Sequence, residues 1–90
     1  MENQHRKITG YRELTQPEID LMNEVKALGV QMESVLAKVS THIGNQRNKT
    51  KTIEDRMNNA TPERFLALAK TEFQTGLMYA TRAVAQPEFF

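Results

Sequence analysis

The sequence predicts an all-α protein: an antiparallel hairpin of two long helices, preceded by a short N-terminal helix or arm. Two stretches carry apolar residues at alternating steps of three and four, the spacing of one helix face. Each begins with a threonine and a proline and stops at a glycine or a proline, which are typical helix boundaries. The alternation typical of strands is absent, so we expect a single helical domain over residues 1–90.

The first long helix has a clear start signal. Thr15 is the expected N-cap, and Glu18 lies three residues later, where it completes a capping box. The polar segment before it, which contains Gly10, is the predicted short helix or arm. We expect the helix to run over residues 16–43 and to stop at Gly44, because glycine readily ends helices.

The apolar stripe of this helix is wider than a contact between two helices needs. The a and d positions of a heptad pattern are Met22, Val25, Gly29, Met32, Leu36, Val39 and Ile43. A further row at the g positions holds Leu21, Leu28 and Val35. Such a stripe suits a helix with two neighbours, one of them from another subunit. Because a 90-residue chain without cysteine has few other means of stabilisation, we expect a compact helical homo-oligomer.

The remainder of the chain predicts a connection and a second long helix. Residues 45–60 are polar, and we expect a loop there, with at most one helical turn around residues 53–57. Thr61 as cap and Pro62 at the first helical position begin the second helix, which ends before Pro87. Its apolar spacing runs through Leu66, Ala69, Phe73, Gly76, Ala80 and Ala83. The small residues among them should let helix axes approach closely.

Composition excludes several classes of function. With 12 basic and 11 acidic residues the net charge is +1, which argues against a protein that coats long nucleic acids. No apolar run is long enough for a membrane span, and the polar N-terminus does not resemble a signal peptide, so we expect a cytoplasmic protein. The two histidines lie far apart in the sequence, and cysteine is absent, so we expect no metal site and no cofactor.

The sequence gives little support for catalysis. No nucleophile lies beside a plausible base, no glycine-rich phosphate loop is present, and no pair of carboxylates suggests a pocket. We therefore expect a protein that binds rather than an enzyme.

Three positions suggest recognition of an anionic ligand, and each also has a purely structural interpretation. Lys26 flanks the apolar stripe, where its ammonium can hold a phosphate or simply border an interface. Tyr11 in the arm can stack on a nucleobase or pin the arm to the helices. Arg64 lies in the first turn of the second helix, where a bound anion offsets its unfavourable position. Thr71 and Thr75 share its helix face, and all three can equally be solvated side chains.

Two segments resemble a known family. YRELTQPEIDLMNEVKALG, residues 11–29, and PERFLALAKTEFQTGLMYATRAVAQP, residues 62–87, are similar to the phage-encoded anti-CBASS protein two family. Together they cover about half of the chain, whereas residues 45–60 add nothing to the resemblance. Members of that family are sponges that sequester the cyclic oligonucleotide signals of bacterial CBASS immunity without cleaving them.

The resemblance implies a homohexamer, acting in the cytoplasm of the infected bacterial host, with two kinds of pocket. Cyclic dinucleotides would bind between protomers, where the tyrosine and lysine of the family match Tyr11 and Lys26. Cyclic trinucleotides would bind on a three-fold axis at the start of the second helix, where Arg64 is the best match and Thr71 and Thr75 are further candidates. Since a two-fold border supplies each residue twice and a three-fold axis supplies it three times, a nearly neutral chain can concentrate positive charge locally.

Two other classes of function stay open at this point. The chain could be a structural or partner-binding helical oligomer, in which the tyrosine and lysine are interface residues only. It could also be a phosphodiesterase that hydrolyses the same messengers.

Overall fold

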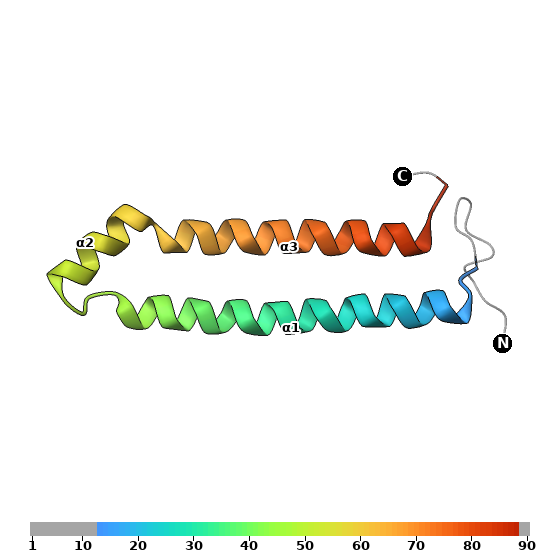
Figure 1. Ribbon diagram of the computed structural model, residues 1–90, viewed down its shortest axis with the longest axis horizontal. Coiled ribbons are helices and arrows are strands. Elements are labelled where there is room, and N and C mark those ends of the chain that lie inside the picture. Colours follow the sequence, from blue (N-terminus) through green and yellow to red (C-terminus); the bar gives the residue numbers. More distant parts are fainter. Residues whose placement is uncertain (1–12, 89–90) are drawn as a thin grey trace.

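The computed structural model describes residues 13–88, which form α1 (Gln16–Gln46), α2 (Lys51–Ala60) and α3 (Pro62–Ala85). α1 and α3 run antiparallel side by side, and α2 closes the turn at one end (Figure 1). The prediction of an all-α hairpin of two long helices is confirmed. The predicted N-terminal helix or arm lies largely outside the described residues.

The start of α1 agrees with the capping box that the sequence predicts. The Thr15 backbone N–H donates to Glu18 Oε1 over 2.8 Å, and the Glu18 N–H donates to Thr15 Oγ1 over 3.4 Å. Two amides that the helix itself cannot satisfy thereby gain partners, a motif that stabilises a helix by about 1 kcal/mol. The cap fixes where α1 begins and so sets the phase of its apolar stripe.

The predicted end of α1 is wrong by three residues. The helix continues to Gln46, with Gly44 inside it, and Arg47 is the C-cap. The chain reverses at Asn48, which has a left-handed φ of 63°. Asparagine tolerates this conformation better than most residues, so the reversal needs no glycine.

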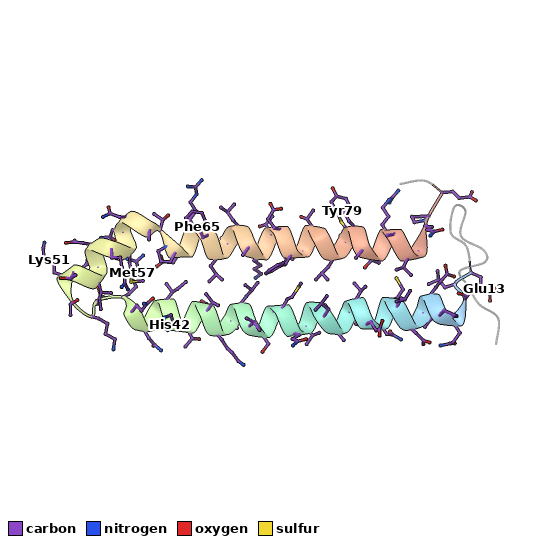
Figure 2. All side chains as sticks on the ribbon, in the orientation of Figure 1. Glu13, His42, Lys51, Met57, Phe65 and Tyr79 are labelled. Carbon is purple, nitrogen blue, oxygen red and sulfur yellow. The ribbon has the colours of Figure 1, made fainter. Side chains whose placement is uncertain are left out.

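The segment expected to hold a loop and one helical turn around residues 53–57 contains the ten-residue helix α2, so the helix was expected in the right place but was predicted too short. Thr50 caps it, because its Oγ1 accepts a hydrogen bond of 3.2 Å from the Ile53 N–H. Met57 from α2 is 2% exposed and Ile43 from α1 is 7% exposed, and they are the buried apolar residues of the described chain. Met57 lies at the closed end of the hairpin (Figure 2). A local cap and the burial of Met57 therefore account for a helix in a largely polar segment.

Thr61 occupies the position predicted for it but not the predicted role. Its backbone is left-handed, with φ 46° and ψ 58°, and it joins the end of α2 to the start of α3. Its side chain makes no capping hydrogen bond, so the expectation of a threonine cap is wrong in its chemistry. α3 ends at Ala85, before Pro87, as the sequence predicts.

The seam between α1 and α3 uses a different register on α3 than the sequence suggested. The covered apolar positions of α3 include Leu66, Ala69, Leu77, Ala80 and Val84, whereas Gly76 and Ala83 are exposed. A step of three residues from Phe73 leads to Gly76 and a step of four leads to Leu77, and both are apolar. The larger of the two, Leu77, lies in the seam. The close approach expected at Gly76 is therefore absent within the hairpin, where a Cβ on it would meet nothing within 4 Å. Gly29 on α1 has that role, since a Cβ there would lie 3.1 Å from Leu77 Cδ1.

A single hairpin leaves much apolar surface exposed. Its accessible surface is 7416 Å², whereas a folded monomer of this mass exposes about 5,400 Å². Eleven large apolar side chains of the described residues are exposed, among them Val30 at 65% and Tyr79 at 62%. The elongated shape, 62 × 23 × 17 Å, explains why little of this surface is covered. Among the helices described, none combines the length and apolar character that crossing a membrane requires.

Candidate functional site

A groove of about 820 Å³ follows one side of the seam between α1 and α3. Its floor consists of apolar seam residues, and charged side chains stand on its rim. The charged residues on the groove are Lys26, Glu33, Glu63 and Lys70. Because the groove carries two lysines and two glutamates, it has no net charge within one hairpin. Any preference for anions therefore depends on the part of the groove where the ligand binds.

Lys26 lies where this groove meets a second hollow of about 520 Å³. Gly29, Leu77 and Gln74 also line both hollows, and the close packing of Gly29 on Leu77 forms the floor between them. Lys26 therefore lines both hollows together with apolar residues and with one neutral amide residue, Gln74, from the facing helix. A phosphate could bind the ammonium here while an attached base covers the floor.

Glu63, the carboxylate at the turn end of the groove, lies far from Lys26. With Gly29 opposite Leu77 as the register, Lys26 and Glu63 are separated by about 25 Å along the hairpin, at 1.5 Å per residue. At physiological ionic strength the Debye length is about 8 Å, so Glu63 has little influence on an anion at Lys26. With respect to Glu63, the end of the groove at Lys26 is therefore better suited to a phosphate than the turn end.

Tyr11 lies outside the described residues, so whether it approaches Lys26 stays a prediction. The described chain begins two residues later, at Glu13, which lies at the open end of the hairpin where α1 begins (Figure 2). Lys26 is about three turns of α1 from that end.

The three residues expected to form the second pocket lie on α3. Arg64 and Thr71 are exposed and Thr75 is half-buried. Their spacing of seven and four residues places all three on one helix face, away from the seam. Tyr79, one turn beyond Thr75, projects away from α1 (Figure 2). The face that carries Arg64 therefore points out of the hairpin and can meet other copies of the chain.

The polar chemistry of these three residues differs. Within the described residues, no hydrogen bond or ion pair engages the guanidinium of Arg64, so it can bind an anion without losing a partner. The Thr71 hydroxyl donates to the carbonyl oxygen of Ala67 over 3.2 Å. It would have to give up that bond to donate to a phosphate, which makes Arg64 the stronger phosphate ligand of the two.

The two candidate sites are well separated. The same helix register puts Lys26 and Arg64 about 24 Å apart along the hairpin, and on different helices. Among the described residues, the structure thus does not bring Lys26 and Arg64 together within one chain.

A cluster that sequence reasoning missed joins all three helices at the turn. Arg47 Nε donates to Glu63 Oε2 over 2.7 Å, and Nη2 donates to Oε1 over 2.5 Å, a two-pronged ion pair. Nη1 of the same guanidinium donates to Asn58 Oδ1 over 3.0 Å. Arg47 and Glu63 are 16 residues apart, so no local spacing in the sequence could have indicated the contact.

The pKa values of the pair follow from this contact. The hydrogen bonds from Arg47 are the main reason why the pKa of Glu63 lies below its ordinary value of 4.5. In turn, the hydrogen bond to Glu63 raises the pKa of Arg47 above its ordinary value. At neutral pH the pair is therefore fully ionised and electrically compensated.

No group of three or more histidine, aspartate or glutamate side chains in residues 13–88 lies close enough together to hold a metal ion.

Comparison with known proteins identifies a family and a relative of this chain. A family model described as "Acb2/Tad1, hairpin domain" matches residues 3–85. Anti-CBASS protein 2 of Pseudomonas phage JBD67 is 42% identical over 106 aligned positions, which cover 98% of this chain and 98% of that protein.

Proposed function

The chain belongs to the Acb2/Tad1 hairpin-domain family, and from this membership we propose that it is a phage protein that counteracts CBASS immunity by binding and sequestering cyclic dinucleotides and cyclic trinucleotides. It acts in the cytoplasm of the infected bacterium and returns its ligands unchanged. The observation that carries the proposal is the similarity to an anti-CBASS protein over nearly the whole length of both chains.

The cyclic dinucleotide site of this proposal uses Lys26 and Tyr11. Lys26 supports it because it lines both hollows together with Gln74 and the apolar residues Gly29 and Leu77. A cyclic dinucleotide carries two phosphates and two bases, so two copies of the chain related by a two-fold axis can each serve one half.

The cyclic trinucleotide site uses Arg64, with Thr71 and Thr75 on the same face. The exposure of Arg64 at the start of α3 supports it, because the positive end of the helix dipole favours a bound anion there. Three copies around a three-fold axis would place three guanidinium groups against three phosphates.

Both sites require assembly, and we propose a homohexamer. The surface of the whole chain, its two ends included, exceeds that of a folded monomer of this mass by about 2,000 Å². This excess is comparable to the area that stable interfaces bury. Exposed apolar side chains on both long helices, such as Leu28 and Phe65, provide the contact surface.

The exposed apolar surface is also what a purely structural or partner-binding oligomer would present, so binding has to be measured. The experiment is a calorimetric titration of the purified chain with cyclic diadenylate and with cyclic triadenylate, with light scattering to measure mass. We expect both ligands to bind to a hexamer. Assembly without binding of either ligand would support the structural alternative.

Chromatography of ligand released by heat after long incubation distinguishes a sponge from a phosphodiesterase. We expect intact cyclic nucleotide in full yield. Linear products that increase with protein concentration and time would show that the chain is a phosphodiesterase.

A further inference from the structure

The ion pair at the turn holds the carboxylate that is nearest in sequence to the proposed trinucleotide site. Glu63 directly precedes Arg64, so their Cα atoms are about 3.8 Å apart. Successive helical residues point about 100° apart, and Glu63 lines the groove beside α1, on the side where Arg47 binds it. Arg64 is left on the outward face of α3.

An uncompensated carboxylate at this position would oppose anion binding. A phosphate held by Arg64 would experience a negative charge within about one Debye length, which is 8 Å at physiological ionic strength. On a three-fold axis the repulsion would come from three copies of Glu63 at once. Protonation cannot relieve it near neutral pH, because carboxyl groups there are ionised.

We propose that Arg47 is a positioning residue for the trinucleotide site: its two-pronged contact compensates Glu63 and turns the carboxylate towards α1, which leaves Arg64 as the uncompensated charge that meets the ligand. This inference rests on the proposed function, since it presupposes that Arg64 binds a phosphate. It adds a role for α1 in a site otherwise built from α3. Asn58 Oδ1 accepts a third hydrogen bond from the guanidinium of Arg47 and so helps to fix the plane of that group.

The competing interpretation is that the contact only holds the turn together. Both interpretations predict that loss of Arg47 weakens trinucleotide binding, so a single substitution does not separate them. Removal of the negative charge as well does separate them. If Arg47 acts by compensating Glu63, its loss has no consequence once Glu63 is neutral, whereas a purely structural contact is absent in the double variant too.

The experiment titrates cyclic triadenylate into Arg47→Ala, Glu63→Gln and the double variant Arg47→Ala/Glu63→Gln. We expect binding to weaken by about tenfold in Arg47→Ala, because three carboxylates then repel the ligand from within about one Debye length. The double variant and Glu63→Gln should bind within about twofold of the unmodified chain, because no carboxylate is left to repel the ligand. Cyclic diadenylate should bind all variants equally, since Lys26 is about 25 Å away.

Circular dichroism and mass accompany each variant. Arg47→Gln, which removes the charge and retains amide donors, replaces Arg47→Ala if the latter does not assemble. Equal weakening in the single and double variants would overturn charge compensation and assign the contact a structural role. Unchanged binding in Arg47→Ala, together with loss in Arg64→Ala, would overturn this inference alone. No binding of cyclic triadenylate to the unmodified chain would overturn the trinucleotide part of the proposed function and this inference with it.

Discussion

Replacing Lys26 by alanine tests the dinucleotide site most directly. The substitution removes an ammonium from the rim of the groove and leaves the apolar floor intact. A charge-assisted hydrogen bond contributes about 1.5–3 kcal/mol, so cyclic dinucleotide affinity should fall about ten- to a hundredfold. Tyr11→Ala should produce a similar loss, because stacking on one base contributes about 1–3 kcal/mol.

The same substitutions should leave cyclic trinucleotide affinity within about twofold of the original. The separation of about 24 Å between Lys26 and Arg64 along the hairpin is three Debye lengths at physiological ionic strength. Arg64→Ala should show the reverse selectivity: trinucleotide affinity falls at least tenfold, because three guanidinium groups are lost around one ligand, while dinucleotide affinity is retained.

The assay is isothermal titration calorimetry with cyclic diadenylate and cyclic triadenylate, and light scattering verifies the mass of each variant. Lys38→Ala is the matched control for Lys26, because Lys38 is an exposed lysine of α1 that does not line the groove. Arg56→Ala on α2 is the corresponding control for Arg64. If assembled Lys26 and Arg64 variants each lose both ligands, the reasoning from two separate sites is refuted. If neither loses a ligand, both residues are structural.

Three further predictions concern the hairpin itself. Thr15→Ala should cost about 1 kcal/mol of unfolding free energy in urea, whereas Thr61→Ala should cost much less, because the Thr61 side chain makes no capping bond; equal losses would contradict the cap geometry. Met57→Ala should cost about 2–5 kcal/mol, since Met57 is 2% exposed, and a negligible change would mean that the turn end is not packed. Arg47 lowers the pKa of Glu63 below 4.5, so the contact contributes fully to the free energy of unfolding above that pH. This contribution is lost as the pH falls through the lower pKa that Glu63 has in the folded state. Thermal unfolding between pH 6 and 3 should therefore show a smaller loss of stability in Glu63→Gln than in the unmodified chain, and identical profiles would contradict this sign.

The parts of the fold that sequence reasoning predicted correctly depend on local interactions. Thr15 and Glu18 are three residues apart, so their reciprocal hydrogen bonds are evident from spacing alone. Pro87 ends α3 because proline cannot continue a helix, whatever surrounds it. The same reasoning predicted α2 too short, because a ten-residue polar segment has little propensity signal and Met57 becomes buried only once the hairpin has folded.

The parts that were missed depend on contacts between distant residues. Gly76 and Leu77 both continued an apolar spacing from Phe73, and only the packing of α3 on Gly29 of α1 selects Leu77. The Arg47 contact with Glu63 likewise exists only once the hairpin has closed. For the candidate site, periodicity placed the three α3 residues on one face, but their roles, and those of Lys26 and Tyr11, came from family resemblance and stay predictions.

The displaced register has a consequence for assembly. Leu77 in the seam leaves Gly76 exposed on α3, where a glycine inside a helix costs about 1 kcal/mol relative to alanine and gains nothing within one hairpin. Leu21, Leu28 and Val35, the g row of α1, are likewise exposed at 46–50%. Val30, nine residues after Leu21, lies on the opposite edge of α1 and is 65% exposed. Apolar surface on both edges allows each hairpin to contact two different neighbours. A closed assembly with both two-fold and three-fold borders requires such a pair of contacts, and the two proposed ligand classes need those two kinds of border.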